Sequence, residues 1–347
     1  MPHHRNSVAV VAGGSAGVGR AVVSALLDRG HRVAVLARGQ ERLDDIACRY
    51  PGRVWTRAID VADGAALDAA GNAIMGEFGR PEIWVNSAML TSYSPFMEMG
   101  EEEFRRITDA TYHGTVNGCR TALRVLRRGN VVNVGSGLAY ASVPFQSAYC
   151  GAKHAVEGFT QALRIELMRD GRPVTLSMVQ LPAVNTPQFD WARNRMRRHP
   201  QPVPPIFQPE VAARAVLRAI DTDAREILVG GPVLKLMAGN MLLPTLVERQ
   251  LARSGVEAQQ ADYPDDHGPD NLEGPVTDYP AVAHGAFDAQ AREAGLIVDG
   301  DVARKAAVAA GAALLLLAGA AIGRASARPD RRRLAAPAVI GRDRRLR

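Results

Sequence analysis

From Val8 to about Val229, short apolar runs of strand length alternate with amphipathic helical patterns. Apolar residues on both faces are typical of strands buried in a parallel sheet, where each connection crosses over through a helix. The alternation therefore predicts an α/β fold with a Rossmann-like, doubly wound parallel sheet of about seven strands and a C-terminal extension. The expected strands are Val8–Val11, Arg32–Leu36, Val54–Ile59, Ile83–Val85, Asn130–Val134, Val174–Val179 and Glu226–Val229. The expected helices include Gly17–Arg29, Ala65–Phe78, Phe104–Leu126, Tyr149–Met168 and Pro209–Ile220.

Composition and charge divide the chain into four parts. Residues 1–230 form the expected catalytic domain, and the proline-rich stretch 182–208 within it is a predicted substrate lid, because ligands bind at the carboxyl ends of such strands. Residues 231–255 are an apolar helical extension that could pack on the domain, form a dimer contact or lie on a membrane. Residues 256–300, rich in Asp, Pro and Gly, are expected to be an extended linker. Residues 301–347 combine an apolar segment, 306–323, with a basic tail.

A glycine-rich turn stands between the first expected strand and the first expected helix. Its glycines are Gly13, Gly17 and Gly19. Glycine permits a tight turn and lets the backbone approach a pyrophosphate, whose charge the free N–H groups at a helix start can bind. The spacing predicts a dinucleotide site, with a purely structural turn as the alternative.

The end of the second expected strand bears on the choice of dinucleotide. An acidic side chain usually stands there to hold the ribose 2′-hydroxyl of NAD, but here Arg38 occupies the position and no carboxylate occurs before Glu41. A guanidinium suits a 2′-phosphate, so NADP is favoured over NAD. A solvated surface arginine is the alternative.

Three further residues complete a known pattern. Ser136 follows a strand, and Tyr149 and Lys153 stand four residues apart on one face of a helix. A phenol is a poor proton donor or base at neutral pH, and a neighbouring ammonium stabilises its phenolate. Together with the glycine spacing, this set resembles the non-extended branch of the short-chain dehydrogenase/reductase family over residues 7–230. The resemblance implies an NADP(H)-dependent oxidoreductase that interconverts a carbonyl and an alcohol, with Tyr149 as general acid/base assisted by Lys153 and Ser136.

The same resemblance implies further contacts with the cofactor. The sequence also departs from the family pattern at several positions. The implied contacts are Gly13, Ser15, Gly17, Val18, Gly19, Arg38, Asp60, Val61, Asn86, Ala88, Tyr149, Lys153, Pro182, Val184 and Thr186. Thr111 stands where the family commonly has an asparagine that holds a proton-relay water. Ser87, Met89 and Ala183 also replace common family residues. These departures leave room for a second function, a catalytically weak sensor or scaffold that binds NADP.

The remaining expectations concern partners and location. Three widely spaced cysteines and no secretory signal predict a reducing, cytoplasmic location without a disulfide framework or a metal site. The segment 306–323 is barely long enough to cross a bilayer, and with its flanking arginines it favours membrane association, by spanning the bilayer or resting on it; a buried helix in an oligomer is the alternative. We expect a hydrophobic small-molecule substrate, a homo-oligomer and no nucleic-acid partner. The basic run of the lid, Arg193 to Arg198, predicts either an acidic substrate handle or a solvated surface.

Overall fold

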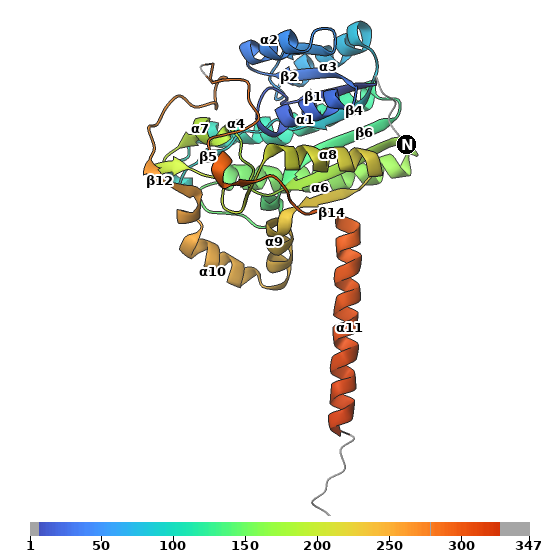
Figure 1. Ribbon diagram of the computed structural model, residues 1–347, viewed down its shortest axis with the longest axis vertical. Coiled ribbons are helices and arrows are strands. Elements are labelled where there is room, and N and C mark those ends of the chain that lie inside the picture. Colours follow the sequence, from blue (N-terminus) through green and yellow to red (C-terminus); the bar gives the residue numbers. More distant parts are fainter. Residues whose placement is uncertain (1–6, 278, 327–347) are drawn as a thin grey trace, which may run out of the picture. The chain divides into compact units, whose positions relative to one another are not determined.

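The computed structural model describes residues 7–277 and 279–326, and its centre is a sheet of eight strands (Figure 1). The strands are β1 (Val8–Ala12), β2 (Arg32–Ala37), β3 (Val54–Ala58), β4 (Pro81–Asn86), β6 (Gly129–Ser136), β7 (Val174–Leu181), β11 (Glu226–Val229) and β14 (Ile297–Asp299). Their order is β14-β11-β7-β6-β4-β1-β2-β3. The seven strands from β1 to β11 pair in parallel with their neighbours, and β14 is an antiparallel edge strand next to β11. The predicted α/β doubly wound fold is confirmed.

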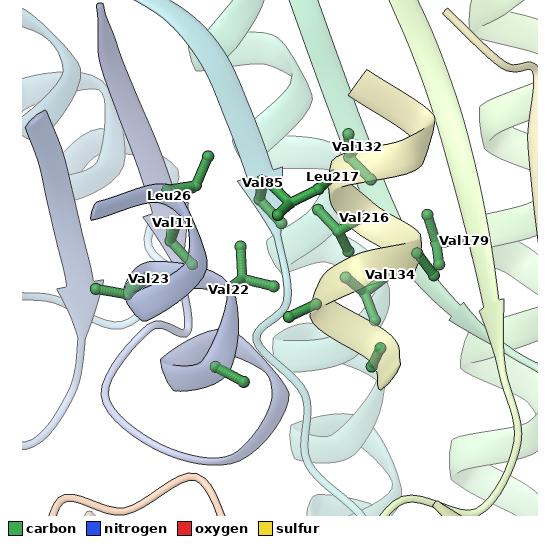
Figure 2. Packing of buried hydrophobic residues seen from close by; sticks show 14 of the residues in the cluster. Val11, Val22, Val23, Leu26, Val85, Val132, Val134, Val179, Val216 and Leu217 are labelled. Carbon is green, nitrogen blue, oxygen red and sulfur yellow. The ribbon is translucent and has the colours of Figure 1, made fainter. Parts of the chain in front are cut away.

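Helices cover both faces of this sheet. The helices that pack against it are α1 (Gly17–Asp28), α2 (Gln40–Arg49), α3 (Gly64–Ala73), α5 (Gly114–Val125), α6 (Ser147–Arg169) and α8 (Pro209–Thr222). Two others lie outside these layers: α4 (Glu101–Thr108) packs on α6, and α7 (Gln188–Trp191) packs on the lid. On one face α1 and α8 pack against valines of β1, β4, β6 and β7 (Figure 2). On the other face α3, α5 and the end of α6 cover the same strands. Local signals set the helix starts: the Asp63 carboxylate accepts from the Ala66 N–H before α3, and Pro209 opens α8.

A π-helical segment, Asp109–His113, joins α4 to α5. The predicted helix 104–126 is therefore one long element with a widened turn in the middle. Such π-bulges often mark functional sites, and this one contains Thr111.

The prediction of an extended linker at 256–300 is wrong. Residues 256–299, which we call the strap, fold back on the catalytic domain and pair with it three times. β12 (Gln260–Pro264) pairs with β9 (Arg198–Pro200), β13 (Ala291–Arg292) pairs with β10 (Ile206–Phe207), and β14 joins the main sheet. Leu272 is fully buried, and Asp270 forms an ion pair with Arg193 at 2.7 Å. The acidic strap is therefore ordered by basic partners in the lid.

The apolar extension at 231–255 consists of two helices, α9 (Gly230–Leu242) and α10 (Pro244–Ser254), which pack on each other. The chain divides into two compact units between Asp301 and Val302. The second unit consists, as far as it is described, of most of α11 (Gly300–Ser326). Within α11, the 23 residues from Gly300 to Ile322 are long and apolar enough to cross a membrane, and an 18-residue window of this stretch has a mean hydropathy of 2.0. Most of the predicted basic tail, residues 327–347, lies outside the described residues.

Candidate active site

The glycine-rich turn lies between the end of β1 and the start of α1, as predicted. Gly13 and Gly17 have positive φ angles of 85° and 56°, a conformation that favours glycine. A Cβ atom on Gly13 would come within 2.5 Å of the Ala88 backbone nitrogen, and one on Gly19 would collide with the Gly13 carbonyl. The turn therefore needs glycine at these positions, and it leaves a cradle at the positive end of α1.

One cavity of about 1080 Å³ connects this turn with Ser136, Tyr149 and Lys153. It is lined by the predicted residues Gly13, Ser15, Gly17, Val18, Gly19, Arg38, Asp60, Val61, Ala88, Ser136, Tyr149, Lys153, Pro182, Val184 and Thr186. They come from the carboxyl ends of the parallel strands, from the loops that follow and from the first turns of α1 and α6, the region where ligands bind in open α/β sheets. The cavity is large enough for a dinucleotide and a small substrate together.

Ser136, Tyr149 and Lys153 lie on neighbouring elements at one end of this cavity. Ser136 is the last residue of β6, and the other two lie on the first turns of α6. The Lys153 ammonium is 5.6 Å from the centre of the Tyr149 ring and donates a 2.8 Å hydrogen bond to the Val134 carbonyl. Lysine and phenol therefore share one side of their helix and face the same space.

Burial acts in opposite directions on the two titrating groups. It raises the pKa of the Tyr149 phenol, an effect that a hydrogen bond with the Ser136 hydroxyl partly offsets. It lowers the pKa of the Lys153 ammonium to about 8. At neutral pH the phenol thus holds its proton and most of the lysine remains charged. The site combines a proton donor with a cation that favours the conjugate base.

The strap covers the part of the cavity that contains Arg38 and the glycine-rich turn. The Arg38 guanidinium donates to the carbonyls of Asn271 and Leu272, the second at 3.2 Å. The Gly17 N–H, at the start of α1, donates to the Val282 carbonyl at 3.1 Å. These are two of the donors expected to bind phosphate groups. In this structure they are held by backbone oxygens of the strap.

Asp60 has a cationic neighbour that the sequence did not reveal. Its carboxylate accepts from the Ala62 N–H at 2.9 Å and forms an ion pair with Arg106, which also donates to the Leu272 carbonyl. Burial would raise the pKa of Asp60, but these bonds outweigh burial and lower it. Asp60 is therefore ionised and tied to the strap through Arg106.

Two predicted site residues do not line the cavity. The Asn86 amide accepts from the Trp84 indole at 2.8 Å and donates to the Asn133 side chain at 2.8 Å, inside the sheet. The Thr111 hydroxyl accepts from the Leu90 N–H at 3.0 Å and donates to the Leu90 carbonyl at 3.1 Å. Asn86 thus connects β4 with β6 by a side-chain hydrogen bond inside the sheet. Thr111 connects the π-helical segment with the loop after β4. Their contacts with the cofactor and with a relay water stay predictions.

Within the basic run of the lid, Arg197 and Arg198 are exposed, as the solvated-surface interpretation predicts, but two other arginines form ion pairs. Arg193 pairs with Asp270 of the strap, and Arg195 pairs with the buried Glu103 carboxylate at 2.6 Å. Both guanidiniums therefore hold the lid in place. Neither is a free handle for an acidic substrate.

Several cavity residues were missed by the sequence analysis. They are Tyr93, Leu138, Val143, Gln146, Leu236, Leu251, Gln259, Asn271 and Pro275. Most come from the extension and the strap, where no motif marks a ligand site. The only signal for Leu236 and Leu251 was the apolar character of residues 231–255, and the strap residues carried none.

Comparison with known proteins agrees with this geometry. A family model described as short chain dehydrogenase matches residues 7–197. The chain belongs to the short-chain dehydrogenase family. Members of this family are oxidoreductases that bind a nicotinamide cofactor and act in general on alcohols or carbonyls. The resemblance inferred from the sequence is thereby confirmed.

Individual relatives are similar at moderate identity. An uncharacterized oxidoreductase of Bacillus subtilis, YxnA, is 26% identical over 269 residues, which are 75% of this chain and 75% of that protein. A short-chain dehydrogenase from Streptomyces avermitilis has a TM-score of 0.61 at 26% identity and covers 73% of this chain and 97% of its own. A short chain dehydrogenase from Burkholderia cenocepacia, solved in complex with NADP, has a TM-score of 0.60 at 26% identity, with coverage of 71% and 98%.

Proposed function

We propose that the protein is an NADP(H)-dependent oxidoreductase that interconverts a carbonyl and an alcohol, with Tyr149 as general acid and base. The observation that supports this most directly is that Ser136, Tyr149 and Lys153 line the same cavity as the glycine-rich turn. When bound, the nicotinamide cofactor supplies or accepts the hydride. The chain itself has to hold the phosphates, orient the substrate oxygen and move one proton.

Each of these tasks has a residue suited to it. The turn and the start of α1 would hold the pyrophosphate, and Arg38 the 2′-phosphate. The Ser136 hydroxyl would donate to the substrate oxygen, and the Tyr149 phenol would transfer its proton there during reduction. The charged Lys153, 5.6 Å from the Tyr149 ring, would stabilise the phenolate left behind. The NADP bound in the related Burkholderia structure supports the choice of cofactor.

We expect the substrate to be apolar. The lining of the cavity includes the apolar side chains of Leu138, Val143, Val203, Leu236 and Leu251. Val203 and its neighbours belong to the predicted lid, whose prolines give the wall a fixed shape. Such walls bind a ketone or alcohol mainly by excluding water, with Ser136 and Tyr149 fixing its oxygen.

The test is NADPH oxidation over a panel of ketones, aldehydes, 3-oxoacyl thioesters and steroids. Replacement Tyr149→Phe is expected to lower kcat about 100-fold or more, because the proton donor is lost, while NADPH binding stays within about threefold. Replacement Tyr93→Phe removes another phenol from the same cavity and is expected to cost less than about tenfold. Equal losses in both variants would contradict the role of Tyr149.

One observation favours a second function, nucleotide sensing without turnover. The strap holds the Gly17 N–H and the Arg38 guanidinium, so nucleotide binding requires the strap to move or to share these donors. If wild type and Tyr149→Phe bind NADPH equally and neither oxidises it with any carbonyl of the panel, the sensor is supported and the reductase is not.

A further inference from the structure

The turn between α9 and α10 exposes a cluster of aliphatic side chains. Met241, Leu242, Leu243 and Leu246 are 57–75% exposed, and no charged residue lies between Met241 and Leu246. We call residues 241–246 the hairpin tip. Exposed apolar clusters of this kind usually mark an interaction surface, because their hydration is unfavourable.

The inner side of the same hairpin borders the active site. Val233 and Leu236 of α9 lie 3.3 and 3.4 Å from the position that a Cβ atom on Gly137 would take. Gly137 directly follows the catalytic Ser136, and Leu251 of α10 lines the cavity as well. One hairpin thus connects the wall of the substrate space with an exposed apolar surface.

The charge of the hairpin suits an anionic lipid surface. Residues 230–254 contain Lys235, Arg249 and Arg253 but a single acidic residue, Glu248. An aliphatic tip flanked by cations is typical of segments that enter the interfacial region of a bilayer. Independently, the chain carries α11, which is long and apolar enough to cross a membrane.

We propose that the hairpin tip docks on an anionic lipid bilayer, and that an apolar substrate passes from the bilayer along α9 into the cavity. The second half of this statement rests on the proposed function; the docking does not. A bilayer fits the tip better than a second copy of the chain. A specific protein interface needs about 20–30 residues on each side, and the tip has six, all without an aromatic ring.

Docking is tested in the full-length chain by tryptophan fluorescence. Leu243→Trp adds a reporter at the tip, and Ile165→Trp adds one at a similarly exposed apolar site on α6. Both are mixed with phosphatidylcholine/phosphatidylglycerol vesicles that carry brominated acyl chains, and the wild-type signal is subtracted. We expect the signal added by Leu243→Trp to fall about twofold and the signal added by Ile165→Trp to stay constant. Since α11 is present in both variants, the difference reports on the hairpin.

Two results would overturn the docking. One is equal quenching, or none, at both positions. The other is a concentration-dependent blue shift of the Leu243→Trp signal without lipid, which would assign the tip to contact between copies. NADPH binding by both variants shows that they are folded.

Substrate passage has its own measurement. The double variant Leu242→Asp/Leu243→Asp is expected to raise KM about tenfold for an apolar ketone delivered in vesicles, with kcat unchanged. KM for a small water-soluble carbonyl is expected to stay the same. An unchanged KM for the vesicle-borne ketone overturns the passage. Absence of any turnover by the wild type overturns the proposed function instead, and the fluorescence result still decides the docking.

Discussion

Arg38 is the residue on which the cofactor preference depends. Its guanidinium lies at the end of β2, lines the cavity and donates to two strap carbonyls. A 2′-phosphate is a stronger acceptor than a neutral carbonyl, and hydrogen bonds between charged groups contribute about 1.5–3 kcal/mol. Arg38→Ala is therefore expected to weaken NADPH binding roughly 10- to 100-fold and NADH binding much less, as measured by fluorescence titration. If NADPH and NADH lose affinity equally, Arg38 acts through its bonds to the strap and does not bind the 2′-phosphate.

Lys153 makes the stability of the protein depend on pH. Burial lowers its pKa from 10.5 to about 8, so between these values the unfolded chain binds a proton that the folded chain has lost. The free energy of unfolding consequently rises with pH across this window, and the penalty for burying the charge is present in full below pH 8. Relative to Lys153→Met, wild type is expected to gain up to about 3 kcal/mol from pH 8 to 10.5. Urea unfolding of both proteins over this range provides the measurement, and parallel pH profiles would argue against a charged, buried lysine.

Single residues also show where prediction from the sequence ends. Ser136, Tyr149 and Lys153 could be predicted because their chemistry depends on short spacings along the chain and on the register of one strand. The hydrogen bonds of Asn86 and Thr111 could not be predicted, because their partners, Asn133 and Leu90, lie 47 and 21 residues away. A buried polar side chain forms hydrogen bonds with whichever polar groups the fold places next to it. The position of a residue in a family motif does not identify those groups.

At the scale of elements, the seven parallel strands were predictable and the strap was not. Strands buried on both faces carry continuous apolar runs, which few other structures tolerate. The strap owes its order to partners elsewhere in the chain, such as the bond between Asn185 and Asp288 and the burial of Leu272. Its own composition is that of a disordered segment. Long-range electrostatic pairing with the lid therefore outweighed local composition.

A histidine connects the lid with the strap. His199 of β9 lies 3.0 Å from the Asp265 carboxylate of the strap and 3.4 Å from that of Asp190 on α7. The neighbouring Asp190 carboxylate raises the pKa of His199 above 6.5; burial opposes this, and Asp265 adds to it. A raised pKa stabilises the folded state fully below pH 6.5, and this contribution is lost as the pH rises through the folded-state value.

This arrangement predicts pH-dependent release of the strap. Limited proteolysis within the strap is expected to be slower at pH 6 than at pH 8, and His199→Asn is expected to remove most of the difference. His267→Asn is the matched control, since His267 is exposed but contacts the same Asp265 carboxylate. Equal effects of the two variants would assign the pH dependence to Asp265 and its surroundings in general.

At the scale of the whole molecule, the chain combines a complete catalytic unit with a helix that the unit does not need for its core. Both hydrophobic clusters around the sheet consist of residues before 298, and none of the 18-residue apolar window in α11 is buried. The hydrophobic effect stabilises a fold only through apolar area removed from water.

A chain that ends at Asp301 keeps β14 and the Arg225–Asp301 ion pair. It is therefore expected to unfold within about 2 °C of the full-length protein and to bind NADPH with the same affinity. Flotation with anionic vesicles should drop strongly, because α11 is lost. A much lower unfolding temperature would show instead that α11 stabilises the catalytic unit, as a helix packed between copies of the chain does.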